Sequence, residues 1–384
     1  MTEPSIKKIP VWLDCDPGHD DAFAMLFASH HPNINLLGIS TVHGNSSVDH
    51  TTSNALSVLT AVGRTSIPVF RGSKEGLVRP AVHAPDIHGI SGLDGSPLLP
   101  PPAVGPIEGV SYVDAIASAL LATPPGSAWL IATGALTNIA LVFQAYPELA
   151  AHIKGLSIMG GAIGGGFTTA KMGKVDDMSR IGNWSPWAEF NILVDPEAAA
   201  YLFKHPELRR KTVLIPLDVT HLVLATKEVQ ELLLFGKQGK AECQTIVPGR
   251  EGKSRLRLIL FDLLTFFAKT YAEVFGIIEG PPLHDPLAVA VILDGISDIE
   301  IPFYDTVDDN GKSRIERYEV EVVTEGTLEE ARLGSQLGRT IVRLLPEGEE
   351  GVKIPRELDV KRFWTVLEEC VERADEVNLA KGIA

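Results

Sequence analysis

Apolar and polar residues along the first two thirds of the chain form blocks that predict strands followed by helices. Short, continuous apolar runs such as residues 11–13 are typical of strands that are buried on both faces of a parallel sheet. Longer segments with a helical apolar period follow most of them. The predicted order is strand 11–13, helix 22–28, strand 35–42, helix 47–62, strand 67–70, strand 128–132, helix 136–146, strand 156–159, helix 196–204 and strand 212–215.

This alternation predicts an α/β fold with an open, mostly parallel (mixed), Rossmann-like sheet and right-handed crossovers. We expect one large domain over residues 1–384, with a core at 9–295 and a C-terminal β-rich extension and helix at 296–384. Two enlarged loops, about 72–109 and 160–188, follow strand ends and would cover the C-terminal edge of the sheet, where ligands bind in such folds. A third loop, 305–314, is polar.

Four aspartates, Asp14, Asp16, Asp20 and Asp21, lie within the eight residues that follow the first apolar run. Carboxylates this close repel one another and would have raised pKa values unless a positive charge lies among them. The segment contains no lysine or arginine, so a hard divalent cation is the expected partner. An acidic turn with a helix cap would explain Asp20 or Asp21 alone, but not all four.

Composition excludes several other classes of protein. The chain has 384 residues, of which 45% are hydrophobic and 22% charged, and a formal net charge of −15, which argues against binding to nucleic acid. We expect no signal peptide and no membrane span, because the apolar stretch 256–275 is interrupted by charged residues. Three cysteines without CxxC spacing are typical of a reducing compartment, so we expect a cytoplasmic or also nuclear location.

Further polar groups follow other strand ends. His284 and Asp285 precede the apolar segment 287–293, where they could supply an acid/base group and a metal ligand or merely cap a helix. The carbonyl group of Thr133 is free at the end of strand 128–132, and Asn45 follows the second strand. One loop carries two amides and a carboxylate suited to hydrogen-bonding a polyol, namely Asn183, Asn191 and Glu189. Taken singly, His43 and His88 are more typical of solvated loop histidines.

Together these motifs resemble those of the inosine–uridine preferring nucleoside hydrolases. The run LDCDPGHDDA at 13–22 is similar to the specific N-terminal signature of that family, and the other motifs follow in the family's order over most of residues 11–293. They are HGN at 43–45, IHGISGL at 87–93, TGALTN at 133–138, IMGG at 158–161, AEFNILVDPEA at 188–198, PLDVTH at 216–221 and LHDP at 283–286. The length is more similar to that of the eukaryotic uridine nucleosidases, and residues 171–180 and 300–345 look inserted or enlarged relative to shorter members.

The resemblance implies a calcium site and a ribose site. Asp16, Asp21, Asp285 and the carbonyl of Thr133 would hold Ca²⁺, whose remaining positions take two ribose hydroxyls and the attacking water. Asp16 would also be the general base, and Asp14 would support the ion from behind its ligands. The residues that would contact ribose are Asp20, Asn45, Asn183, Glu189 and Asn191, with Met159 packed nearby. His284, expected to titrate near neutral pH, would protonate the departing base, and His88 would lie near the base pocket.

The reaction implied is uridine + water → ribose + uracil with inversion, as part of nucleoside catabolism or salvage, and inosine, cytidine and nicotinamide riboside are other candidate substrates. The expected partners are a small-molecule ribonucleoside and further copies of the chain in a homo-oligomer (dimer or tetramer), with neither nucleic acid nor membrane.

Two other functions fit the acidic segment. One is phosphoryl transfer with Asp14 as nucleophile and Asp16 as acid, which would require a cationic group to hold phosphate. The other is a calcium-stabilised protein that binds nucleosides without hydrolysing them. The sequence also leaves open whether Trp184 and Trp187 stack on a base or pack an insertion, and whether the helix around Tyr271 reaches the base.

Overall fold

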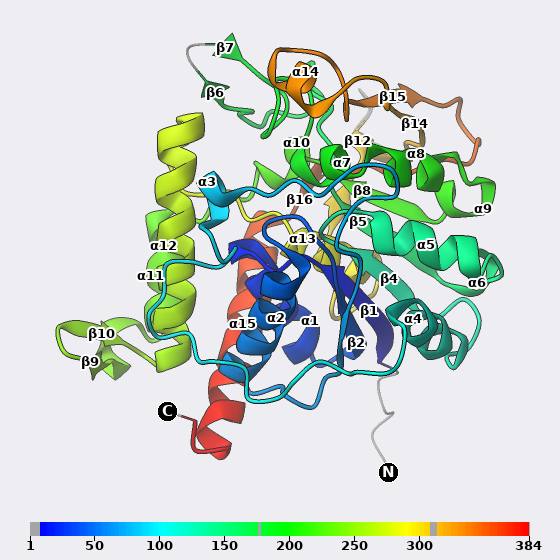
Figure 1. Ribbon diagram of the computed structural model, residues 1–384. Coiled ribbons are helices and arrows are strands. Elements are labelled where there is room, and N and C mark those ends of the chain that lie inside the picture. The colour runs from blue at the N-terminus through cyan, green and yellow to red at the C-terminus, as the bar shows by residue number, and fades with distance from the viewer. Residues whose placement is uncertain (1–7, 176–177, 308–312, 384) are drawn as a thin grey trace.

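A six-stranded sheet forms the centre of the protein (Figure 1). In the computed structural model, which describes residues 8–175, 178–307 and 313–383, the strand order is β3-β2-β1-β4-β5-β8 and every pairing is parallel. The strands are β1 (Ile9–Cys15), β2 (Ile34–Thr41), β3 (Val69–Arg71), β4 (Trp129–Ala132), β5 (Gly155–Met159) and β8 (Thr212–Ile215). The α/β prediction is therefore confirmed, and the strand order reverses between β1 and β4, where open sheets of this type bind ligands.

Helices cover both faces of the sheet because successive strand side chains enter different hydrophobic clusters. Val11 and Leu13 of β1 belong to one cluster, and Trp12 between them belongs to the other. The first cluster contains α1 (His19–His30), α2 (Val48–Ala61), α12 (Arg255–Phe275), α13 (Pro286–Ala290) and α15 (Val360–Ala380). The second contains α4 (Tyr112–Leu121), α5 (Thr137–Ala145) and α8 (Pro196–Lys204). Figure 1 shows these three helices together on the right, away from α12 and α15.

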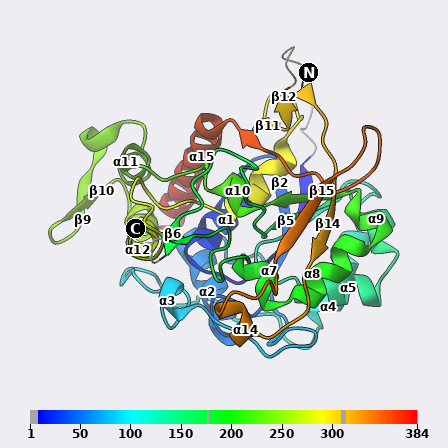
Figure 2. The ribbon, with the colours of Figure 1, turned by 90° about the horizontal axis from the view of Figure 1, so that it is seen from above.

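Short elements lie over the carboxyl ends of the strands, at the top of the view in Figure 1. The enlarged loop at 72–109 contains α3 (Pro85–His88), and the loop at 160–188 contains β6 (Lys174–Val175) and β7 (Met178–Ser179). Next to them are α7 (Phe190–Val194), α10 (Leu217–Thr220) and α14 (Leu328–Arg332). Seen from above in Figure 2, α7, α10 and α14 lie between α12 and the pair β14 (Tyr318–Val322) and β15 (Thr340–Leu344).

The remaining elements lie around this core. They are α6 (Leu149–His152), α9 (Pro206–Arg209), α11 (Lys227–Phe235), η1 (Gly239–Glu242), β9 (Gln244–Val247), β10 (Arg250–Gly252), η2 (Val291–Leu293), β11 (Phe303–Tyr304), β12 (Thr306–Val307), β13 (Ser313–Arg314) and β16 (Glu357–Leu358). The polar loop predicted at 305–314 is flanked by β12 and β13, and its residues 308–312 lie outside the described part of the chain. Among the described residues, no helix is both long and apolar enough to cross a lipid bilayer.

A buried ion cluster joins α12 to α15. The side chain of Arg257 on α12 is fully buried and donates hydrogen bonds to Glu368 at 2.9 and 3.0 Å, to Glu372 at 2.9 Å and to Asp375 at 2.6 Å. These three acids lie on one face of α15. The cluster therefore fixes the position of α12, whose later turns carry aromatic residues of the site described next.

Candidate active site

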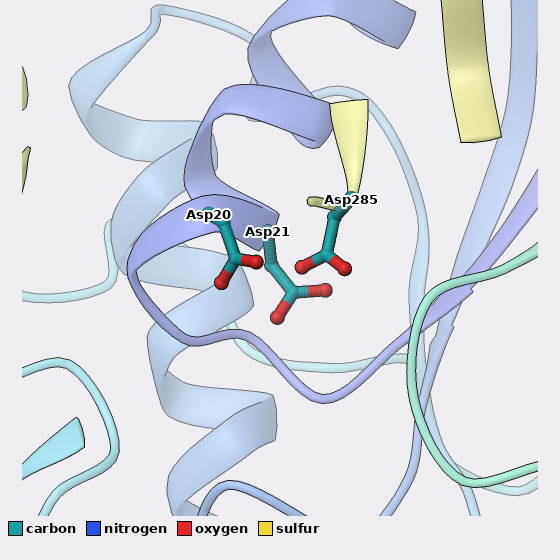
Figure 3. A group of neighbouring side chains, drawn as sticks. All are labelled: Asp20, Asp21 and Asp285. Atoms are coloured by element: carbon teal, nitrogen blue, oxygen red, sulfur yellow. The ribbon is translucent and has the colours of Figure 1, made fainter. Parts of the chain in front are cut away.

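Three carboxylates meet where α1 and α13 begin. Asp20 and Asp21 lie in the first turn of α1, and Asp285 directly precedes α13 (Figure 3). Each offers a carboxylate oxygen within 4.8 Å of the others, and all three side chains are buried. Pro17 and Gly18 end the strand, and the N–H of Gly18 donates to Asp21 at 2.9 Å, which fixes the turn that presents the acids.

Asp16 lies beside these three, and we refer to Asp16, Asp20, Asp21 and Asp285 as the acidic cluster. Oδ2 of Asp16 accepts the backbone N–H of Asn45 at 2.7 Å, whereas the buried Oδ1 has no hydrogen-bond partner among the described residues. Gly44 and Gly134 lie against this carboxylate so closely that a Cβ at Gly134 would be 2.6 Å from Oδ1, and one at Gly44 would overlap Oδ2. The backbone therefore holds Asp16 in one position with one oxygen unsatisfied.

Burial raises the pKa of every carboxyl in the acidic cluster. The pKa of Asp20 rises to about 7 through burial and the charge of Asp21, and burial raises the pKa of Asp21 to about 6. The pKa values of Asp16 and Asp285 rise well above the usual range, first through burial and then through the charges of the neighbouring acids. No lysine or arginine of the described residues forms an ion pair with the cluster. A hard divalent cation fits this set of oxygen donors and would supply the missing positive charge.

Thr133 and Asp14 support the acidic cluster from the sheet. Thr133 follows β4, its hydroxyl donates to Asp21 at 2.8 Å, and its carbonyl oxygen accepts from the amide of Asn191 at 2.9 Å. Oδ1 of Asp14 accepts hydrogen bonds from Asn138 at 2.8 Å and from the hydroxyl of Ser40, and burial raises the pKa of Asp14 to about 7. The hydrogen bonds of the Asp14 side chain thus go to β2 and α5, and its support of a bound ion stays a prediction.

A wall of polar groups faces the acidic cluster from α7. Glu189 caps this helix by accepting the N–H groups of Asn191, Ile192 and Gly161 at 2.8, 3.1 and 2.8 Å. The side-chain amide of Asn191 reaches the carbonyl oxygen of Met159 at 3.3 Å, and Oδ1 of Asn183 accepts the N–H of Phe190 at 2.9 Å. These contacts order side chains that present polar groups to a ligand.

His284, which also lines the cavity, lies between two hydroxyl groups. Its Nδ1 is 2.7 Å from the hydroxyl of Thr220, and its Nε2 is 2.7 Å from the hydroxyl of Tyr271. Burial, followed by the neighbouring His221 and His88, lowers the pKa of His284 well below its ordinary value. The expectation that His284 titrates near neutral pH is therefore not met: the ring is neutral at pH 7, because burial disfavours its charged form.

One cavity brings together ten of the thirteen residues singled out from the sequence. The cavity-lining residues among them are Asp20, Asn45, His88, Thr133, Met159, Asn183, Glu189, Asn191, His284 and Asp285. Asp14, Asp16 and Asp21 do not line it and are fully buried. The described lining contains neither lysine nor arginine, which removes the cationic group that phosphoryl transfer would require.

The helix around Tyr271, whose approach to the base the sequence left open, lines the cavity, and the lining residues that sequence reasoning missed are apolar. Phe267 and Phe275 of α12 line the cavity with Tyr271, and they are spaced four residues apart on one helix face, a signal that the sequence contained. Ala84, Ile87 and Phe190 complete the apolar lining. The structure also separates the two tryptophans left open, because Trp184 lines the cavity, whereas Trp187 donates to the carbonyl of Gly334 at 3.1 Å.

Trp184 is backed by the enlarged C-terminal region. The guanidinium of Arg332 on α14 lies 4.8 Å from the ring of Trp184, and that of Arg339 lies 4.5 Å from the ring of Trp187. Ala188 and Leu337 belong to the small hydrophobic cluster that joins the two segments. The enlarged region therefore packs against the loop that carries the polar wall.

The buried carboxylates lie where the strand order of the parallel sheet reverses, next to a cavity lined by polar and aromatic side chains. Such an arrangement is typical of an enzyme site for a small polar molecule. The sequence profile of the inosine-uridine preferring nucleoside hydrolases matches residues 11–365, and the chain belongs to that family. It is thus a nucleoside hydrolase, and members of the family bind a metal ion.

Relatives and solved structures agree with this assignment. The uridine nucleosidase of Saccharomyces cerevisiae is 37% identical over 97% of this chain and 99% of its own length. A pyrimidine-specific ribonucleoside hydrolase from Salmonella arizonae is 36% identical over 74% of this chain and 79% of its own. The structure of a plant nucleoside hydrolase, PpNRh1, superposes with a TM-score of 0.71 at 25% identity, covering 94% of this chain and 98% of the other.

Proposed function

We propose that the protein catalyses calcium-dependent hydrolysis of uridine to ribose and uracil. The observation that supports this most directly is the acidic cluster, in which the buried Oδ1 of Asp16 has no hydrogen-bond partner among the described residues, together with a cavity lined by polar and aromatic side chains, including Asp20 and Asp285 of the cluster. Preference for a pyrimidine base is supported by the similarity to a yeast uridine nucleosidase over nearly the whole chain and to a bacterial pyrimidine-specific hydrolase.

The metal in this proposal is Ca²⁺, held by Asp16, Asp21, Asp285 and the carbonyl oxygen of Thr133. The donors are all oxygens, which calcium prefers to the nitrogen and sulfur ligands typical of zinc. When bound, calcium would offset the buried negative charge, orient hydroxyl ligands and make water more acidic.

Asp16 serves as the general base in this proposal. As the C1′–N bond of the nucleoside breaks, its electron pair goes to the base, while a water oxygen bonds to C1′ and Asp16 takes a proton from that water. Burial and the charge of Asp21 raise the pKa of Asp16, whereas a bound cation would favour its carboxylate form, which is the form that can accept the proton. The surrounding carboxylates also stabilise the positive charge that develops on the ribosyl ring.

The polar residues at α7 hold the sugar together with Asp20 of the acidic cluster and Asn45. Asp20, Asn45, Asn183, Glu189 and Asn191 hydrogen-bond the ribose hydroxyls, with Met159 packed against the ring. Glu189 and Asn191 are held by backbone and side-chain contacts before a ligand binds, so little conformational entropy is lost when they engage the sugar.

Tyr271 and His284 assist the departing base. Because His284 is neutral, it passes a proton on only if it receives one at its other ring nitrogen. The hydroxyl of Tyr271 remains protonated, since burial and the charge of Asp20 raise the pKa of Tyr271 well above its usual value. The pair therefore offers the leaving base a hydrogen bond and a path for one proton.

Ribose release tests the proposal. Purified protein is incubated with uridine, cytidine, inosine or nicotinamide riboside, and reducing sugar is measured with calcium present and after chelation. We expect release to be fastest with uridine, to stop on chelation and to return when Ca²⁺ is restored. Asp16→Asn should lower kcat by about 10²- to 10⁴-fold, the usual contribution of a general base.

Asp262→Asn is the matched control, because this acid lies on α12 outside the cavity lining. It should leave kcat within about twofold of the parent. Calorimetric titration with Ca²⁺ shows whether Asp16→Asn has also lost the ion. Ribose release that survives both chelation and Asp16→Asn would refute the mechanism, and the absence of release from every nucleoside would refute the proposed activity.

A further inference from the structure

Two buried histidines form a hydrogen-bonded pair beside the base side of the cavity. His19 opens α1 and is 1% exposed, and His88 ends α3 and is 7% exposed. Their Nδ1 atoms are 3.1 Å apart, and Nε2 of His19 is 2.7 Å from the backbone carbonyl oxygen of Asp94. His88 lines the cavity, and His19 lies behind it.

The carbonyl group at Asp94 determines the direction of hydrogen bonding along this chain. A carbonyl oxygen only accepts, so Nε2 of His19 carries a hydrogen. A neutral imidazole has a single N–H, which leaves a lone pair on Nδ1 of His19. The contact between the two Nδ1 atoms is then a hydrogen bond only if Nδ1 of His88 donates. Nε2 of His88 is consequently unprotonated and acts as an acceptor.

The surroundings keep both rings neutral. The ring of His19 stacks on Phe266, with centroids 4.9 Å apart and planes inclined by 2°, and lies 5.8 Å from the ring of Phe267. Both imidazoles are buried and lie against phenyl rings, with His88 5.6 Å from Phe267, and such surroundings disfavour a charged ring. The carboxylate of Asp94 makes no hydrogen bond to either ring, since its oxygens accept from the N–H of Ile90 at 2.9 Å and the hydroxyl of Ser91 at 2.5 Å.

We propose that His19 is a positioning residue that fixes His88 in the tautomer whose Nε2 accepts a hydrogen bond from the nucleobase. Nε2 of His88 has no hydrogen-bond partner among the described residues, so it remains for a ligand in the cavity. The site then selects a base that presents an N–H, and on uridine the only such group is N3–H. This inference rests on the proposed function and specifies how its base is recognised.

Substrate discrimination is the first test. The ratio of kcat/KM for uridine to that for 3-methyluridine is measured in the parent protein, in His19→Leu and in Phe266→Leu. We expect the parent to favour uridine by about 10²-fold or more, since a site built to hydrogen-bond an N–H rejects the analogue without it. In His19→Leu the ratio should fall at least about tenfold, because His88 is no longer held in one tautomer.

Phe266→Leu is the matched control, because it alters the packing on His19 without removing a hydrogen bond. The methyl group of 3-methyluridine is the same in every assay, so a change in the kcat/KM ratio between variants reports the hydrogen bond from N3–H to His88. An unchanged ratio in His19→Leu, or an equal fall in Phe266→Leu, would overturn the proposal.

The tautomer is the second test and does not depend on activity. The intact, calcium-loaded protein is labelled with ¹⁵N-histidine, and the His88 signals are assigned from their loss in His88→Gln. We expect the shift of an unprotonated nitrogen at Nε2 and a protonated nitrogen at Nδ1 in the parent. A protonated Nε2 would overturn the inference even if uridine is hydrolysed, and this measurement decides the matter if His19→Leu does not fold. Failure to hydrolyse any nucleoside would instead count against the proposed function, and the spectrum would still report the tautomer.

Discussion

Replacing Arg257 by methionine should strongly destabilise the protein. The side chain of Arg257 is fully buried, and Glu368, its ion-pair partner, is only 1% exposed. Glu368 would keep its buried carboxylate without a partner, whereas Glu372 and Asp375 are 41% and 13% exposed and can be hydrated. Removing one member of a buried ion pair costs about 3–5 kcal/mol, so we expect a loss in that range in the free energy of unfolding at pH 8.

The loss should be smaller at pH 5. The pKa of Glu368 is already raised by burial, although Arg257 opposes this, and without the guanidinium it will rise further. A carboxyl whose pKa is higher in the folded than in the unfolded state contributes most stability below its unfolded pKa and loses it as pH rises through the folded pKa. Between pH 8 and pH 5 the folded variant binds a proton at Glu368 and recovers part of its stability.

Urea denaturation at both pH values, with saturating calcium, measures these changes. Arg257→Met/Glu368→Leu should regain most of the lost stability, since apolar replacement of both partners is often neutral. Lys237→Met is the control, because its pair with Glu369 is exposed and should contribute less than about 1 kcal/mol. A loss below about 1 kcal/mol in Arg257→Met, or an equal loss at both pH values, would refute this reasoning.

Three further predictions concern the active site. Tyr271→Phe removes the hydroxyl that lies 2.7 Å from Nε2 of His284. It should lower kcat for uridine by about 10- to 100-fold with little change in KM, as measured by steady-state kinetics. Gly44→Ala places a Cβ against Oδ2 of Asp16 and should weaken calcium binding in calorimetry, whereas Gly105→Ala, with open space at its Cβ, should not; equal affinities would contradict the packing argument. Calcium affinity should rise between pH 5.5 and pH 8, because the proposed ligand Asp21, whose pKa burial raises to about 6, must lose a proton to bind the ion, and a pH-independent Kd would contradict this.

Local sequence determined the first part of the site. An apolar run, the breakers Pro17 and Gly18, and acids at a helix start are short-range signals, so β1, the turn and α1 could be predicted from the chain itself. Residues this close in sequence also lie in one part of the fold, which is why an oxygen-rich cation site was predicted from residues 14–21 alone, although Asp14 lies outside the acidic cluster. The family motifs then indicated the distant members of the site.

Only the tertiary structure decided which groups from distant segments contact the site residues. Asp285 and Thr133 join the acidic cluster because the parallel strands end at one edge, in an order that no single segment specifies. The neutrality of His284 and the hydrogen-bond direction from Asp94 through His19 to His88 likewise depend on contacts between segments far apart in sequence. Burial and hydrogen-bond partners are properties of the packed chain, and because they set the pKa values and tautomers, residue types on their own leave the chemistry of these groups undetermined.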